Sequence, residues 1–269
     1  MAVEKQDAPL SLEYVEEYTI LRCETGSTVH GLSVAGTDDR DELGICIEPK
    51  EYVIGLRHFE QYVHRSQPTG VRSQPGDLDL TIYGLRKFAS LALKGNPSIL
   101  LLFNVPDDKC IVRTYAGDML RESAWMFASK KAGSAFLGYM QQQRQRLMGE
   151  RGQMNVKRPE LVAKYGFDTK YAGHIIRLGF QGIDYMTTGS FPIPMPDEQR
   201  EFILAVRTGL VEENDVLTRA GELEKELKSC IDSSPLPKEP NYAAVNDLLI
   251  ASYQRVWRDG ATPRSEGSK

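Results

Sequence analysis

The 269-residue sequence has few cysteines, and none of them forms a closely spaced pair. Its four cysteines are far apart along the chain, and no C-x-x-C pair occurs. This spacing argues against a zinc knuckle. Cys23 and Cys46 lie in apolar, strand-like runs, so we expect both to be reduced residues of the hydrophobic core.

Long apolar runs and an excess of positive charge are also absent. No run of 18 apolar residues occurs, so we expect no membrane span. The first 17 residues lack the apolar centre of a signal peptide, and we expect a cytoplasmic protein. A formal net charge of −4 argues against an extensive DNA-binding footprint, and leaves room only for a local basic groove.

The stretch from Gly26 to Pro49 carries the strongest chemical pattern. Asp39 and Asp41 stand just ahead of the apolar run from Leu43 to Ile47. Residues i and i+2 of a strand point to the same side, so a strand beginning near Asp39 would bring both carboxylates together. Such a pair needs a cation between its charges, and oxygen-only ligands suit Mg²⁺, with Mn²⁺ as the alternative ion.

Gly26 and Ser27 follow an expected strand at residues 18–24. A Gly-Ser turn offers free backbone N–H groups and a hydroxyl, which together can hold a phosphate. A phosphate-binding turn beside a carboxylate pair is the minimum equipment for phosphoryl or nucleotidyl transfer.

At these residues the sequence resembles the polymerase-β-type nucleotidyltransferase superfamily. It is most similar to a branch of bacterial and phage proteins with the pattern G-S-x-x-(Y/H)-G-L, S/T-D-x-D and R-G. The matching positions are Gly26, Ser27, His30, Gly31, Leu32, Asp39, Asp41 and Gly44. The Arg of the branch is replaced by Leu43. Residues 85–103, the GYMQQQ element at 138–143 and YGFDTKYAGHIIRL at 165–178 resemble the same branch.

The resemblance also implies a third carboxylate on a strand beside the Asp-x-Asp strand. Asp79 fits this position best, because it aligns with the acid that precedes the following helix in the branch. Asp77, two residues before it and on the same face of the expected strand, is the alternative. Outside this context, both would be solvated edge residues. The expected metal site therefore comprises Asp39, Asp41 and Asp79, which hold two Mg²⁺ ions.

Lys170, His174 and Arg177 have helical i, i+4, i+7 spacing. On spacing alone this stripe is typical of a solvated helix face. In the branch the corresponding helix faces the active site, so the resemblance implies that Lys170 and His174 contact the triphosphate or the substrate. Gly26 and Ser27 are the other expected phosphate-binding residues. It places Arg177 beside an acidic partner. Tyr139, Gln143 and Arg146 share one face of another expected helix.

The resemblance implies an α+β fold: a mixed β-sheet nucleotidyltransferase domain with flanking helices, followed by an α-helical domain. We expect the catalytic domain at residues 1–112, a helical domain closing the cleft at 113–257 and a disordered tail at 258–269. Residues 64–77 read as a flexible loop, either a plain connector, which we favour, or a basic flap over the triphosphate.

The implied activity is Mg²⁺-dependent transfer of an NMP from an NTP to an acceptor, with release of pyrophosphate. An RNA 3′ end, a protein side chain, a small molecule and a second nucleotide all remain open as acceptors. The alternative is a catalytically inactive nucleotide-binding regulatory protein of the same fold, which the replacement by Leu43 favours. A third alternative, a structural or partner-binding protein, would leave the Asp pair in a solvated loop.

Overall fold

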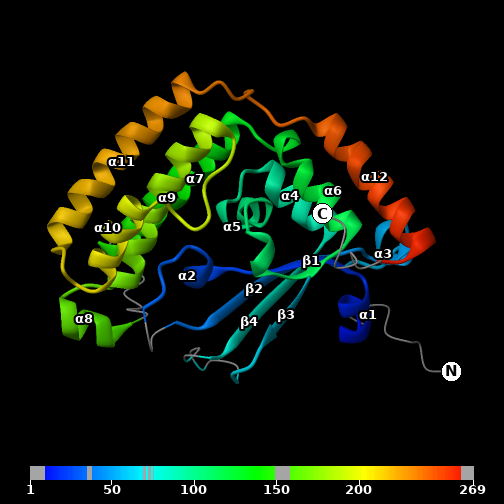
Figure 1. Cartoon of the computed structure of the whole chain (residues 1–269), viewed down its shortest axis with the longest axis horizontal. Coiled ribbons are helices and arrows are strands. Elements are labelled where there is room, and N and C mark those ends of the chain that lie inside the picture. Colours follow the sequence, from blue (N-terminus) through cyan, green and yellow to red (C-terminus); the bar gives the residue numbers. More distant parts are fainter. Residues whose placement is uncertain are drawn as a thin grey trace.

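The computed structural model describes residues 10–34, 38–68, 71, 74, 76–148 and 158–261. Within this part of the chain, a five-stranded sheet is combined with helices on both of its faces (Figure 1). The strands are β1 (Thr19–Glu24), β2 (Arg40–Cys46), β3 (Gln61–Arg65), β4 (Leu78–Gly84) and β5 (Cys110–Arg113). The first helices are α1 (Leu12–Glu17), α2 (Gly26–Val29), α3 (Lys50–Val53), α4 (Leu85–Leu93), α5 (Pro97–Leu100) and α6 (Tyr115–Glu122). The later helices are α7 (Lys130–Leu147), α8 (Pro159–Tyr165), α9 (Thr169–Thr188), α10 (Asp197–Arg207), α11 (Glu213–Ser233) and α12 (Tyr242–Asp259).

The sheet is mixed, with the strand order β3-β4-β2-β1-β5. Strands β2 and β4 are parallel, and all other neighbours are antiparallel. In the parallel pair Asp41 lies opposite Asp79, so the register places one acidic residue of each strand side by side. This architecture confirms the predicted α+β fold with a mixed sheet and a following helical region.

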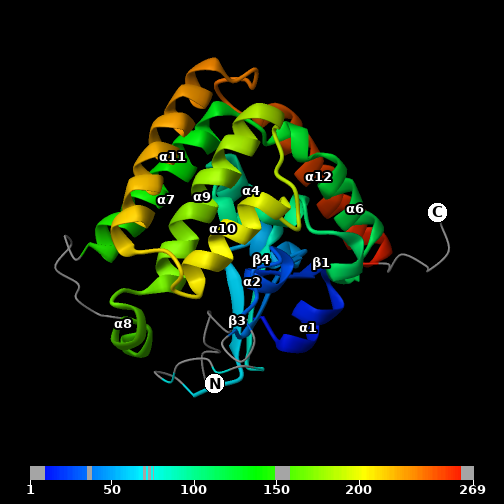
Figure 2. The ribbon, with the colours of Figure 1, turned by 60° about the vertical axis from the view of Figure 1, so that its left-hand side comes forward.

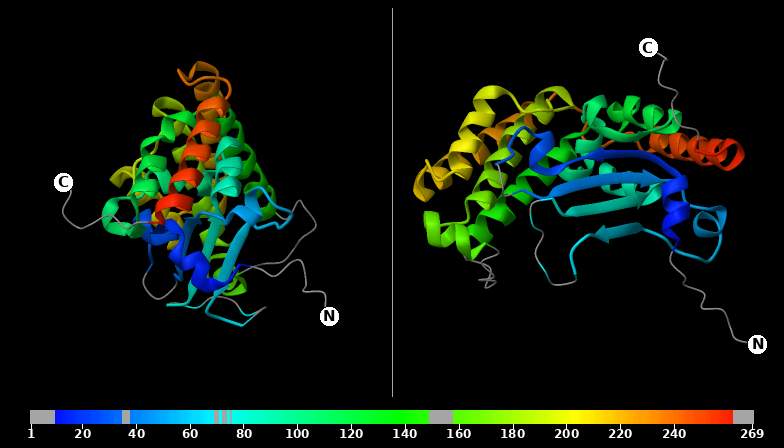
Figure 3. Two further views of the ribbon diagram at one scale, coloured as in Figure 1. Left: turned by 90° about the vertical axis from the view of Figure 1, so that its right-hand side faces the viewer. Right: turned by 60° about the horizontal axis from the view of Figure 1, so that its bottom comes forward.

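Alternation along β4 separates the two faces of the sheet. Leu80 and Ile82 are buried in a small core with residues of α1, α3 and the segment after α3. Helix α1 lies at one end of this face (Figure 3). Because successive side chains of a strand point to opposite faces, Asp79, Thr81 and Tyr83 share the other face. That face belongs to the side of the sheet on which the main core and the helices α4, α5 and α9 lie.

Helix α9 lies at the centre of the helical region, in contact with α7, α10 and α11 (Figure 2). Its glycines make this packing possible. A Cβ added at Gly179 would lie 2.9 Å from Cβ of Leu223, and one at Gly182 would lie 3.0 Å from Cβ of Phe136. The tight packing fixes the position of α9. Its opposite face, which carries Lys170, His174 and Arg177, is therefore held in a defined position beside the start of β2.

Helix α12 returns to the sheet and packs against α4 and α6, on the side away from α11 (Figure 1). Glu48, only 1% exposed, anchors it. The Glu48 carboxylate accepts hydrogen bonds from the Tyr253 hydroxyl (2.7 Å) and the Leu85 N–H (2.9 Å), and the Trp257 indole donates to the Glu48 carbonyl (2.8 Å). The division into domains at residues 112 and 113 stays a prediction.

Strand β3 corrects one expectation from the sequence. His64 and Arg65, assigned to the start of a loop at 64–77, are the last residues of this edge strand. Most β3 side chains are exposed, so the strand lacks the apolar alternation that reveals a half-buried strand. Residues 69, 70, 72, 73 and 75 of the expected loop, and residues 262–269 of the expected disordered tail, lie outside the described residues.

No helix in the described part of the chain has both the length and the apolar character needed to cross a membrane.

The Glu48 anchor predicts a stabilising role for a single hydroxyl. Tyr253→Phe removes the donor to Glu48 and the acceptor of the Arg86 N–H (3.1 Å). A lost hydrogen bond to a buried charged group costs about 1.5–3 kcal/mol, so the free energy of unfolding should fall by that amount in urea titrations. Tyr115→Phe, at a half-exposed tyrosine of α6, is the matched control and should change it by less than about 0.5 kcal/mol. Equal stability of wild type and Tyr253→Phe would contradict the anchor.

Candidate active site

The Gly-Ser turn lies directly against the carboxylate strand. Gly26 has φ +71°, and a Cβ at this position would lie 2.2 Å from Oδ2 of Asp41. Glycine is therefore required both by the backbone conformation and by the approach of the carboxylate. The Thr25 N–H donates to the Asp41 carbonyl (2.8 Å), which holds the turn to the start of β2.

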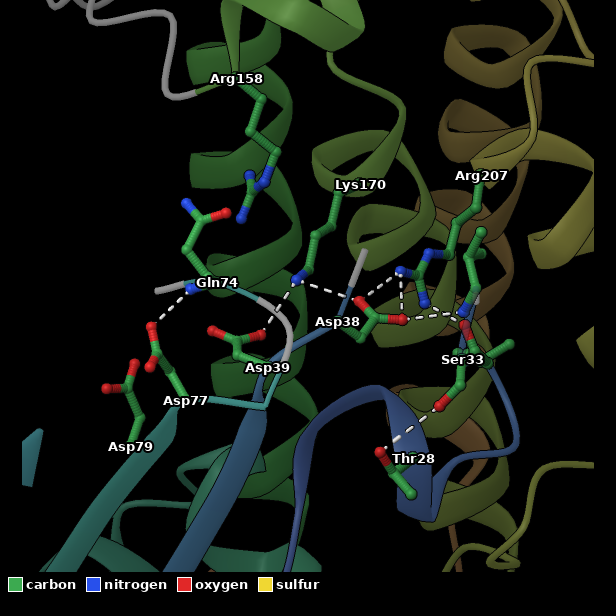
Figure 4. Close-up of polar contacts among 12 residues, drawn as sticks. Thr28, Ser33, Asp38, Asp39, Gln74, Asp77, Asp79, Arg158, Lys170 and Arg207 are labelled. Carbon is green, nitrogen blue, oxygen red and sulfur yellow. Dashed lines mark hydrogen bonds and ion pairs between the residues drawn. The ribbon is translucent and has the colours of Figure 1, made fainter. Parts of the chain in front are cut away.

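Three predicted metal ligands come together. Carboxylate oxygens of Asp39, Asp41 and Asp79 lie within 4.8 Å of one another. Asp77, the alternative third carboxylate, does not join them: its oxygens accept hydrogen bonds from the Gln74 N–H (2.7 Å) and the Ser66 hydroxyl (3.0 Å). Figure 4 shows the contact of Asp77 with Gln74. The strand register, which pairs Asp41 with Asp79, therefore places Asp79 in the carboxylate cluster.

The clustering of negative charge changes the titration of Asp41. Burial, reinforced by the charges of Asp39 and Asp79, raises the pKa of Asp41 from 3.8 to about 6, although Lys170 and Arg177 oppose the shift. A bound cation would relieve this repulsion. The three carboxylates offer oxygen ligands only, which is the donor set that Mg²⁺ prefers, so the residues present fit the metal that the sequence implies.

Asp38, a residue that the sequence analysis did not single out, connects the sheet to the helices. Its carboxylate pairs with Arg207 of α10 (2.8 Å) and with Nζ of Lys170 (3.1 Å). Arg207 also donates to the Leu32 carbonyl. Burial opposes ionisation of Asp38, but the Val34 N–H, Arg207 and Lys170 together lower its pKa below the ordinary value. The adjacent acids of the D-D-R-D sequence are the only signal that could have drawn attention to it.

Lys170 lies between the acidic groups and the helical region. Its Nζ is 3.1 Å from Asp38 and 3.3 Å from Asp39 (Figure 4). The predicted helical stripe therefore faces the site. Lys170 neutralises part of the negative charge of the carboxylates, and its side chain also lines the cavity next to them.

His174 and Arg177 occupy the same face of α9. Burial and the charges of Arg177 and Arg158 lower the pKa of His174 from 6.5 to about 3, so its imidazole is neutral at physiological pH. Burial and Arg207 lower the pKa of Arg177 to about 10, and the charge of Asp41 opposes this shift. Arg177 thus remains a cation, and Asp41 is the acidic group that stabilises it.

A cavity of about 360 Å³ opens between the Gly-Ser turn and the helices. Its lining combines the turn and Asp41 with cationic residues from four segments. The cationic lining residues are Arg146, Arg158, Lys170, Arg177 and Arg207. Sequence reasoning missed Arg158 and Arg207, because neither has a motif of its own and both reach the site only through the packing of α8 and α10 against α9.

Three polar atoms of this cavity lack protein partners. Oε1 of Gln143 and the Nε atoms of Arg158 and Arg177 are buried and have no hydrogen-bond partner among the described residues. All three residues line the cationic cavity. Buried polar atoms are normally satisfied, so a polar ligand in this cavity would supply the missing partners. Gln143 lies three residues before Arg146, the spacing that predicts one shared helix face.

A second cavity, of about 380 Å³, is lined by Asp41 together with residues of β2 and β4. Gly26, Asp41, His174 and Arg177 line both cavities, so the two meet at Asp41. Leu43, which replaces the Arg of the resembling branch, lines the second cavity.

The raised pKa of Asp41 predicts that its charge destabilises the metal-free protein. The folded pKa of about 6 exceeds the ordinary value of 3.8, so protonation stabilises the fold fully below pH 3.8 and this contribution is lost as the pH rises through 6. Asp41→Asn should raise the free energy of unfolding by about 1–3 kcal/mol at pH 8, and by much less at pH 4.5. Denaturant unfolding in EDTA measures both, with Asp77→Asn as control. Destabilisation of Asp41→Asn at pH 8 would assign this carboxylate a structural role.

Comparisons with known proteins agree with the motifs. A search of curated proteins finds no match. Among solved structures, a nucleotidyltransferase-like protein from Exiguobacterium sibiricum is 13% identical, with a TM-score of 0.30; the match covers 82% of this chain and 71% of that one, and carries no argument about the site. The family model of RlaP, the RNA repair pathway DNA polymerase beta family, matches residues 5–251. The match spans nearly the whole chain and confirms the resemblance read from the sequence: the protein belongs to the RNA repair pathway DNA polymerase beta family, a polymerase-β-type nucleotidyltransferase family.

Proposed function

We propose that the protein is a Mg²⁺-dependent nucleotidyltransferase that transfers an NMP from an NTP to a hydroxyl of an RNA end and releases pyrophosphate. The observation that carries the proposal is a cluster of three carboxylates of which one, Asp41, also lines a cavity with five cations and the Gly-Ser turn. Acidic ligands for a cation and basic ligands for phosphates occur side by side, as transfer from an NTP requires.

The cationic cavity is the proposed triphosphate site. Guanidinium groups match phosphate oxygens with paired N–H donors, and Lys170 adds a point charge. Gly26 and Ser27 line the same cavity, so their backbone and hydroxyl groups are available to the phosphates. Neutral His174 contributes one N–H donor and no charge. The buried Nε of Arg177 gains an acceptor when a phosphate occupies the site.

Asp39, Asp41 and Asp79 are the proposed ligands of two Mg²⁺ ions. When bound, these ions neutralise charge on the triphosphate and favour ionisation of the attacking hydroxyl. Neighbouring side chains hold the Asp79 carboxylate. The Gln67 side-chain amide donates a hydrogen bond to it (2.9 Å), and Nε of Arg65 lies 3.6 Å from the same oxygen. These contacts fix the orientation of Asp79 on the side of the second cavity.

In the proposed reaction, the hydroxyl oxygen forms a bond to the α-phosphorus while the bond from that phosphorus to the bridging oxygen breaks. The two oxygens lie roughly in line on opposite sides of the phosphorus. Pyrophosphate leaves within the cationic cavity, where arginines and Lys170 stabilise its charge. The proton of the hydroxyl passes to Asp79, the carboxylate that lines only the second of the two cavities.

The family description supports RNA as the class of acceptor, because it places the family in an RNA repair pathway. The net charge of −4 is compatible with contact at one RNA end and argues against contact along an extended strand.

The third carboxylate gives the sharpest test of transfer. Asp79→Asn should retain most of the affinity for Mg²⁺ and NTP, because Asp39 and Asp41 remain, but lose transfer by about a hundredfold or more. Calorimetry measures binding, and incubation with each α-labelled NTP and single-stranded RNA measures transfer. Asp77→Asn, in the same segment but outside the cluster, is the matched control and should transfer normally. Binding without transfer by the wild type would favour the inactive nucleotide-binding protein.

Lys170 separates phosphate binding from metal binding. Lys170→Ala should weaken NTP affinity about 10- to 100-fold, the scale of a lost hydrogen bond to a charged group, with a smaller change in Mg²⁺ affinity. Lys164→Ala, at an exposed lysine of α8, is the control and should leave NTP affinity unchanged. Equal NTP affinity of Lys170→Ala and wild type would show that Lys170 does not bind the NTP and that its role is the structural ion pair with Asp38.

A further inference from the structure

The two cavities divide the roles of the substrates, because they meet at Asp41. An in-line displacement places the attacking and leaving oxygens on opposite sides of the phosphorus. If pyrophosphate leaves into the cationic cavity, the acceptor must approach from the other side of Asp41. We infer that the second cavity holds one unpaired terminal nucleotide of the RNA acceptor, with its free hydroxyl at Asp79; this inference rests on the proposed function.

Three side chains along β4 follow one another in the order of the hydroxyl, the sugar and the base of a nucleotide. Asp79, Thr81 and Tyr83 lie on one face of β4, at successive alternate positions, and all three line the cavity. The carboxylate of Asp79 lies at the end shared with Asp41. A hydroxyl at Asp79 therefore leaves the sugar beside Thr81 and the base beside the ring of Tyr83.

The second cavity also has apolar lining residues besides its polar ones. Pro97 of α5, Leu101 just after α5 and Leu178 of α9 line it together with Tyr83, alongside polar residues such as Ser98. Proteins read unpaired RNA ends by stacking a splayed base on an aromatic ring. A volume of about 380 Å³ is at the small end of the range of about 300–1,000 Å³ for ligand pockets. The cavity suits one nucleotide and excludes a base pair.

Charge further restricts the ligand. The second cavity is lined by the carboxylates of Asp41 and Asp79, against the two guanidinium groups of Arg65 and Arg177, whereas the Glu42 carboxylate is paired with Arg22 and Arg40. The first cavity has five cations against Asp41. A terminal phosphate is therefore disfavoured at Asp79, whereas a terminal hydroxyl is accepted. Arg65, with 61% of its side chain exposed, lies at the rim, where it can pair with the phosphate that joins the terminal nucleotide to the rest of the strand.

The test measures binding, so that it does not depend on turnover. Fluorescence anisotropy of labelled single-stranded RNA, with Mg²⁺ and a non-hydrolysable NTP analogue present, compares a 3′-hydroxyl end, a 3′-phosphate end and a blunt duplex. The 3′-hydroxyl strand should bind at least about tenfold more tightly than either of the others. Tyr83→Ala should weaken its binding about 10- to 100-fold, the scale of one base–aromatic stack, while Tyr83→Phe retains it.

Two controls make the assignment specific. Tyr115→Ala removes a half-exposed tyrosine that lines neither cavity, and should leave RNA affinity unchanged. Arg146→Ala, in the cationic cavity, should weaken binding of the NTP analogue in calorimetry, which Tyr83→Ala should leave unchanged.

Three outcomes would overturn the inference. If Tyr83→Ala weakens the NTP analogue instead of RNA, the second cavity holds the nucleoside of the NTP. Equal binding of hydroxyl and phosphate ends, or preference for the duplex, would contradict a cavity for one unpaired nucleotide. If the protein binds no RNA and transfers the label to a small molecule, the acceptor is that small molecule and not RNA. In contrast, wild-type protein that binds the 3′-hydroxyl strand but incorporates no label from any NTP would contradict the proposed function and leave the assignment of the cavity intact.

Discussion

The site depends on holding three carboxylates closer together than their charges favour. Parallel pairing of β2 and β4 places Asp41 beside Asp79, and Asp39 precedes the same strand. The fold offsets this repulsion with cations from another part of the chain, since Lys170 contacts Asp39. The remaining strain is visible in the raised pKa of Asp41. A further cation beside the three carboxylates would reduce this repulsion.

The sheet and the helices are fastened to each other at two places, and the site lies next to one of them. Asp38, before β2, binds both Lys170 of α9 and Arg207 of α10. At the far end of the sheet, the Glu48 carboxylate accepts a hydrogen bond from the hydroxyl of Tyr253 in α12. Because α9 and α10 pack on each other, a change in the position of α9 relative to the sheet would alter the distances between Lys170, Arg207 and the carboxylates.

The two cavities that share Asp41 differ in the charge of their lining residues. The cationic cavity favours the most negative part of a substrate, and the cavity over β2 and β4 favours a group with less charge. Gly26 makes this arrangement possible, because any side chain at this position would occupy the space of the Asp41 carboxylate, where the two cavities meet. One glycine thus sets how closely the Gly-Ser turn approaches the carboxylates.

The sequence by itself determined the groups that local periodicity brings together: Asp39 with Asp41 at the start of a strand, and Lys170 with His174 and Arg177 along a helix face. Only the tertiary structure decided what depends on partners distant in the chain. The register of β2 against β4 chose Asp79 over Asp77, packing of α10 brought Arg207 to Asp38, and burial made His174 neutral. The edge strand β3 was not predicted, because most of its side chains are exposed and do not alternate between apolar and polar residues. Local patterns record only neighbours along the chain, whereas register, ion pairing and burial depend on contacts between segments.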